Sequence, residues 1–89
     1  MTFQDHVNKL GYKAKDQVTG FAGVVTSVSF DLYGCIQYVL TPPAGENGKQ
    51  EGGRWYDALR IQITGKKRVM EVPDFVPDKG PAPKPAGKY

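Results

Sequence analysis

Side chains that commonly perform chemistry are scarce in this sequence. Its 89 residues include a single cysteine, Cys35, and a single histidine, His6. One cysteine cannot form a disulfide within the chain, and one cysteine with one histidine does not supply the ligand spacing of a zinc site. We therefore expect no cofactor and no bound metal.

Catalytic arrangements are missing for a related reason. A nucleophilic pair of Cys35 and His6 would need a third, orienting group, and the acidic residues are too scattered along the sequence to predict an acid–base couple. The apolar surroundings of Cys35 predict a buried structural thiol, whereas His6 is expected at the surface of a short helix. We expect that the protein is not an enzyme.

Long hydrophobic runs and a strong excess of one charge are missing too. No apolar run approaches the length of a membrane span and no secretion signal opens the sequence, so we expect a cytoplasmic protein without a membrane partner. The net charge of +3 is too small to favour nucleic acid strongly as a partner. The local cluster Lys66-Lys67-Arg68 is either a solvated turn or a contact for an anion.

Proline is rare in most of the chain and frequent at its end. Five of the seven prolines fall within residues 73–89, which hold few large apolar groups and cannot offset the entropy cost of ordering. The sequence therefore predicts one domain over residues 1–72 and a disordered, flexible tail over 73–89. That tail serves either as a linker or as a polyproline-II ligand. Because so small a core gains stability from association, we expect a homo-oligomer.

The residues that are present predict mostly β-structure. Phe3, Val7 and Leu10 have helical spacing and indicate a short helix over residues 1–10. Alternating β-branched and aromatic residues then predict five strands and a brief sixth, over 12–18, 24–30, 35–41, 54–57, 60–64 and 69–72. A first hairpin bent at Gly20 and Gly23 is typical of an all-β, SH3-like barrel of five to six strands.

The pattern of each strand also predicts which side chains share a face. In the second strand, Val24, Thr26, Val28 and Phe30 alternate with Val25, Ser27 and Ser29. In the third, Ile36, Tyr38 and Leu40 share one face, and in the fifth Ile61 and Ile63 point inward. The hydrophilic segment 44–53 is predicted to be a long loop.

Arginine and aromatic residues gather in one segment, Arg54-Trp55-Tyr56-Asp57, with Arg60 close behind. An arginine beside aromatic rings can hold an anion while a planar group stacks on the rings. The segment is therefore the candidate binding site. Tyr33 and Tyr38 could extend it or could instead pack in the core and the hairpin turn. The alternative is that Trp55 fills the core while Asp57 caps the turn before Arg60.

Three runs carry a resemblance to known proteins: residues 15–26, residues 32–38 and Arg54-Trp55-Tyr56-Asp57. They resemble small uncharacterised proteins of tailed phages, prophages and mobile gene cassettes such as those of integrons. Residues 16–25 are also similar to the KOW-type SH3-like barrels, which bind nucleic acids and proteins. Phages further encode small β-rich sponge proteins that sequester the cyclic nucleotide signals of bacterial immunity.

These resemblances imply an origin in a mobile element and a role in a bacterial host cell. We predict a non-enzymatic binding protein that recognises a host or phage macromolecule through Arg54, Trp55, Tyr56 and Arg60. The alternative is an oligomeric anti-defence sponge that holds a small nucleotide with the same side chains.

Overall fold

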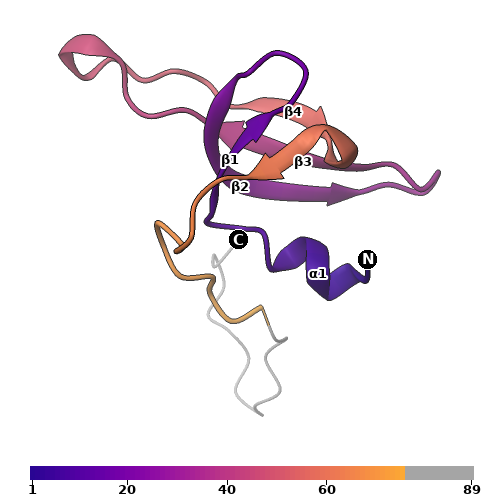
Figure 1. Ribbon diagram of the computed structural model, residues 1–89. Helices are drawn as coiled ribbons and strands as arrows, with labels where there is room; N and C mark the ends of the chain where they lie inside the picture. The colour runs from indigo at the N-terminus through magenta and orange to yellow at the C-terminus, as the bar shows by residue number, and fades with distance from the viewer. Residues whose placement is uncertain (76–89) are drawn as a thin grey trace, which may run out of the picture.

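The protein is built mostly of β-strands, and the computed structural model describes its residues 1–75. Five strands form one antiparallel sheet in the order β4-β3-β2-β1-β5, with one short helix beside it (Figure 1). The elements are α1 (Phe3–Val7), β1 (Lys13–Asp16), β2 (Ala22–Phe30), β3 (Ile36–Thr41), η1 (Glu46–Gly48), β4 (Arg54–Asp57), η2 (Ala58–Arg60) and β5 (Ile61–Ile63). The prediction of an all-β fold with a short N-terminal helix is confirmed.

The sheet is open. Within residues 1–75, β4 pairs only with β3 and β5 pairs only with β1, so these two strands form the edges. The predicted closure into a barrel is therefore not seen in the strand pairing. The predicted sixth strand is wrong, because residues 69–72 adopt bends and irregular structure. One backbone hydrogen bond, from Val69 N to the oxygen of Gly11 at 2.7 Å, ties them to the sheet.

The core lies on one face of the sheet. Ala14, Val25, Tyr38 and Leu40 are fully buried there. The predicted alternation in β3 is confirmed, and the inward positions of Ile61 and Ile63 are confirmed as partly buried contacts with this core.

The predicted alternation in β2 is wrong beyond Val25. Val25 pairs with Leu40 in β3, but the next paired residue in β2 is Ser27, so the register shifts at this point. Such a β-bulge places one extra residue in a strand and reverses the faces of the residues that follow. Val25 and Val28 consequently both contact the core, although an uninterrupted strand would point them in opposite directions.

Helix α1 has only five residues and depends on the sheet. Its start is capped by Thr2 and Asp5, since each backbone N–H is accepted by the other residue's side chain. A helix this short is unstable alone. Phe3 stacks on Phe30 with ring centroids 4.7 Å apart, which holds the helix against β2.

The prediction that His6 lies at the surface is wrong. His6 is 7% exposed, and its Nδ1 atom forms a hydrogen bond of 2.6 Å with the hydroxyl of Tyr38. Burial also raises the pKa of the Tyr38 hydroxyl above its ordinary value. The helix turns His6 toward the sheet and leaves Phe3 65% exposed, so the helix–sheet contact is partly polar.

The prediction that Cys35 is buried is also wrong. Cys35 is exposed in the connection between β2 and β3. The Asp31 carboxylate accepts hydrogen bonds from the backbone N–H groups of Tyr33 and Cys35, at 2.9 and 3.0 Å, and so shapes this turn. Local turn chemistry, rather than the surrounding apolar residues, determines where the thiol lies.

The two long connections leave the sheet at opposite ends (Figure 1). The β2–β3 turn projects from one end, and residues 44–53 form the predicted loop at the other, containing only the single turn η1. Of the predicted tail over 73–89, all but the first three positions lie outside the described residues.

Shortening a core side chain tests this description. Leu40→Ala should lower the free energy of unfolding by about 2–5 kcal/mol, because Leu40 is 0% exposed and a cavity remains. Urea denaturation followed by circular dichroism measures the loss. Leu59→Ala is the matched control: Leu59 is 90% exposed and should change the value by less than about 0.5 kcal/mol. Equal losses in the two variants would contradict the core assignment.

Candidate binding surfaces

Two of the predicted site residues, Arg54 and Trp55, are exposed on β4 but point to opposite faces of the sheet, because Arg54 pairs with the buried Leu40 and Trp55 pairs with Val39. Trp55 is 53% exposed and Arg54 is exposed. The pairing of Val39 with Trp55, beside the pairing of Tyr38 with Tyr56, places Trp55 on the face opposite the core and Tyr56 on the core face. The prediction that Trp55 fills the core is therefore wrong. The predicted cap is confirmed, because the Asp57 carboxylate accepts a hydrogen bond from Leu59 N at 2.9 Å.

Tyr56 and Arg60 form a second group on the core side of β4. The guanidinium carbon of Arg60 lies 5.1 Å from the centre of the Tyr56 ring, and the ring of Phe21 packs against Tyr56 with centroids 5.7 Å apart. The predicted residues thus do not form one surface: Trp55 lies on the outer face of β4, and Arg54 lies on the same face as Tyr56. Tyr33 joins neither, since it lies in the β2–β3 turn with its side chain 88% exposed.

Arg60 is already paired with a buried carboxylate. Its Nε donates to Asp16 Oδ1 at 2.8 Å and its Nη2 donates to Asp16 Oδ2 at 2.6 Å. Asp16 is 0% exposed and also accepts hydrogen bonds from Thr19 and from the backbone N–H of Val18. The Arg60 guanidinium holds the pKa of the Asp16 carboxyl well below its usual range, and Asp16 raises the pKa of Arg60.

The Asp16–Arg60 pair was missed because its members lie 44 residues apart in the sequence. A local signal did exist at Asp16. A carboxylate followed three residues later by threonine is typical of a side-chain-capped turn, and here it precedes Gly20, whose φ is +81°. That signal predicts the turn but not the arginine.

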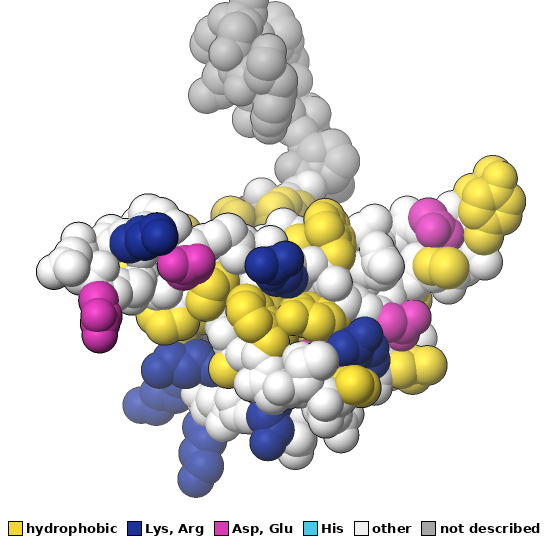
Figure 2. Space-filling model, turned by 90° about the horizontal axis from the view of Figure 1, so that it is seen from above, with side chains coloured by type: hydrophobic (Ala, Val, Ile, Leu, Met, Phe, Trp, Pro, Cys, Tyr) yellow, Lys and Arg dark blue, Asp and Glu magenta, His cyan; other side chains and the backbone are white. Residues whose placement is uncertain are grey.

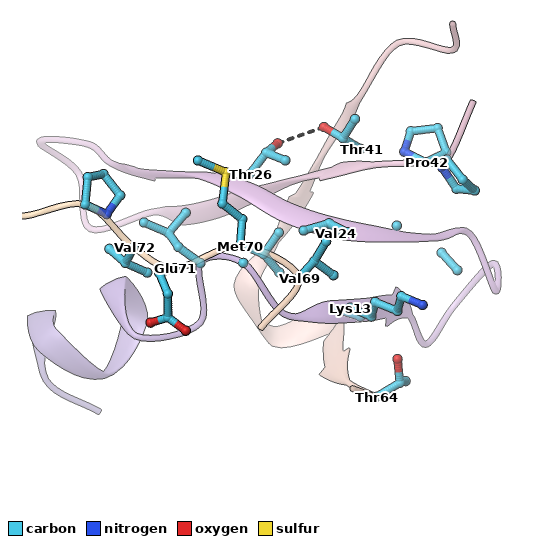
Figure 3. Close-up of a pocket in the computed structure, with 18 of the residues that line it drawn as sticks. Lys13, Val24, Thr26, Thr41, Pro42, Thr64, Val69, Met70, Glu71 and Val72 are labelled. Atoms are coloured by element: carbon cyan, nitrogen blue, oxygen red, sulfur yellow. Dashed lines mark hydrogen bonds between the residues drawn. The ribbon is translucent and has the colours of Figure 1, made fainter. Parts of the chain in front are cut away.

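A second surface is a groove of about 950 Å³, which sequence reasoning did not find. Its lining comes from Leu10 and Gly11, from β1 and β2, from the residues around Pro42, from Thr64 and from the segment Val69–Phe75. Figure 3 shows Val24, Val69 and Met70 pointing into its middle. Of the charged side chains among the described residues, Lys13 and Glu71 line it.

Charge is distributed unevenly over the outside of the molecule. Figure 2 shows one face on which hydrophobic side chains gather in the middle, with Lys and Arg around them and acidic side chains toward two opposite ends. In the cluster Lys66-Lys67-Arg68, the two lysines are exposed and Arg68 is half-buried. Arg68 donates to the backbone oxygens of Leu10 and Asn8 and lies over the Tyr12 ring, so it supports the fold.

Comparisons with known proteins were made at three levels. Searches of protein-family models, curated proteins and solved structures found no match to this chain. Within residues 1–75, no group of three or more His, Cys, Asp or Glu side chains is arranged to hold a metal ion. That same part of the chain contains no helix with the length and apolar character needed to cross a membrane.

Removing the charge of Asp16 should lower stability and flatten its pH dependence. Because the folded pKa of Asp16 lies below its ordinary value of 3.8, its contribution is complete above that value and is lost as the pH falls toward the folded pKa. Asp16→Asn should therefore have a lower urea midpoint than the natural protein at pH 7, and the difference should shrink at about pH 2.5.

Glu46→Gln is the matched control, since Glu46 is an exposed acid in the loop 44–53. It should leave the urea midpoint unchanged at both pH values. If the difference in urea midpoint between Asp16→Asn and the natural protein is the same at pH 7 and at about pH 2.5, the carboxylate charge is not responsible for the loss of stability.

Proposed function

We propose that this is a non-enzymatic binding protein of phage or mobile-element origin, acting in the cytoplasm of a bacterial host. Its recognition site is the β4 edge, with Trp55 on the outer face and Arg54 on the other, and its partner is a protein. The observation that carries the proposal is the 53% exposure of Trp55 on an edge strand. Tryptophan and arginine are the side chains most often responsible for binding energy at protein interfaces.

The edge itself favours a partner that supplies an extended segment. β4 pairs with β3 along one side, and within residues 1–75 its other side has no strand partner. An unpaired edge offers backbone N–H and C=O groups to an added strand, while neighbouring side chains provide specificity. Trp55 can provide it on the outer face of β4 and Arg54 on the opposite face, and the Tyr56–Arg60 contact supports the strand from the core side.

The same proposal includes an SH3-like fold for the sheet. Three features support it: the order β4-β3-β2-β1-β5, the single turn η2 between β4 and β5, and the return of β5 to pair with β1. A bulge in the long β2 strand adds the bend that such small barrels require.

The nucleotide sponge has less support. It would use Arg60 on the anionic groups of its ligand, but the Arg60 guanidinium is already paired through two hydrogen bonds with Asp16. Among the described residues, Arg54 is then the one cationic side chain of this segment that is not held in an ion pair. A catalytic role for His6 is disfavoured in the same way, since its ring is buried against Tyr38.

The proposal predicts that a bound partner covers Trp55. Trp55 is the only tryptophan of the chain, so its fluorescence emission should shift to shorter wavelength when a partner from the host bacterium is added. Trp55→Ser should weaken binding of that partner by about thirtyfold or more, as expected for a residue worth at least 2 kcal/mol at an interface. Quantitative affinity capture followed by titration of the purified partner measures both effects.

Leu59→Ser provides the matched control, because Leu59 is 90% exposed but lies in η2 beyond the edge strand. It should leave the affinity unchanged. Circular dichroism should give the same melting temperature for both variants, which separates a lost contact from a lost fold. A partner that binds Trp55→Ser as tightly as the natural protein would overturn the proposal.

A further inference from the structure

We propose that the groove between the sheet and the segment Val69–Phe75 is a binding site for a small molecule with an apolar body and one carboxylate. The Lys13 ammonium group would pair with that carboxylate. This site is separate from the β4 edge and does not rest on the function proposed above. The size of the groove, the apolar character of its middle and the distribution of charge along it carry the inference.

The size and lining fit a small apolar ligand. Its volume of about 950 Å³ lies at the upper end of the range for small-molecule sites, roughly 300–1,000 Å³. Val24 supplies apolar surface from the sheet, and Val69 and Met70 supply it from the segment opposite (Figure 3). Val69 is 58% and Met70 is 74% exposed, so a ligand there would remove apolar surface from water.

The two ends of the groove differ in charge. Figure 3 shows Lys13 and Thr64 together at one end, and the Glu71 carboxylate turned away at the other. Within residues 1–75 the Lys13 ammonium makes no ion pair. The turn holding the exposed Lys66 and Lys67 packs on Lys13 through Gly65, where an added Cβ would lie 3.2 Å from the Lys13 Cβ. This end therefore favours an anion, and an ammonium group is disfavoured there.

The fold fixes the position of the segment that forms one wall of the groove. An added Cβ on Gly11 would lie 2.6 Å from the backbone oxygen of Met70, so glycine lets the segment approach the sheet this closely. The hydrogen bonds of Arg68 to the oxygens of Leu10 and Asn8 fix the start of the segment. A preformed site of this kind reduces the ordering cost of binding.

The charge at the Lys13 end of the groove also indicates which occupant fits it better, a separate ligand or residues 76–89 of this chain. Residues 76–89 carry three lysines and one aspartate. A basic segment is a poor match for the Lys13 end of the groove, whereas a single carboxylate is a good one. We therefore assign the groove to a ligand rather than to the tail.

The test is titration of the full chain with three ten-carbon probes: decanoate, decanol and decyltrimethylammonium. Methyl NMR spectra should show decanoate shifting Val24, Val69 and Met70, while the indole N–H signal of Trp55 in the nitrogen-correlated spectrum stays fixed. Decanol should bind more weakly by about three- to fivefold, the size expected for one solvent-exposed ion pair, and decyltrimethylammonium more weakly still. Lys13→Gln should reduce decanoate affinity to that of decanol and leave decanol affinity unchanged.

Lys15→Gln is the matched control, because Lys15 is exposed on the same strand and on the same face two residues away, but does not line the groove. It should leave decanoate affinity unchanged. Ala22→Leu places a larger side chain at an exposed position in the groove lining, and it should weaken the binding of all three probes.

Four outcomes would overturn the assignment. They are equal affinity for decanoate and decanol, equal effects of Lys13→Gln and Lys15→Gln, contacts between residues 76–89 and Val24 in the free protein, or contacts of a second copy with Val24. Weakened decanoate binding in Lys13→Gln, with partner binding through Trp55 intact, would keep this site distinct from the proposed protein interface.

Discussion

A buried carboxylate in a sheet this small carries a large desolvation cost unless its charge is paired and its oxygens accept hydrogen bonds. Asp16 meets both conditions through Arg60 and Thr19. Asp16 ends β1 and Arg60 precedes β5, so the pair joins two strands that are far apart in the sequence. The backbone bond from Gln17 N to the oxygen of Arg60 lies beside it, and β5 continues antiparallel to β1 from this point. The same guanidinium lies against Tyr56, so the position of the β4 edge also depends on it.

The sequence was sufficient for features that depend on neighbouring residues. The alternation of Ile36, Tyr38 and Leu40 is uninterrupted, and the predicted faces of β3 are those of the structure. Features that depend on distant contacts were not predictable. The bulge after Val25 has no glycine or proline to mark it, and His6 is buried only because Tyr38 offers it a hydroxyl.

The same distinction between neighbouring residues and distant contacts applies to the two binding surfaces. The segment holding Arg54 and Trp55 is visible in the sequence, but its pattern alone did not decide whether Trp55 fills the core or meets solvent. The strand register decides it, because Trp55 pairs with the outward-facing Val39. The groove could not be predicted because Lys13 and Met70, which line it together, lie far apart in the sequence.

The exposed turn between β2 and β3 has a practical consequence for anyone who handles this protein. Its single thiol, on Cys35, is the only sulfur group of the chain that can form a disulfide, and it projects at one end of the molecule beside the exposed Leu32 and Tyr33. Air oxidation would join two molecules end to end through this turn, giving a covalent dimer. The apparent mass of the protein should therefore be compared with and without a reducing agent before a subunit number is assigned.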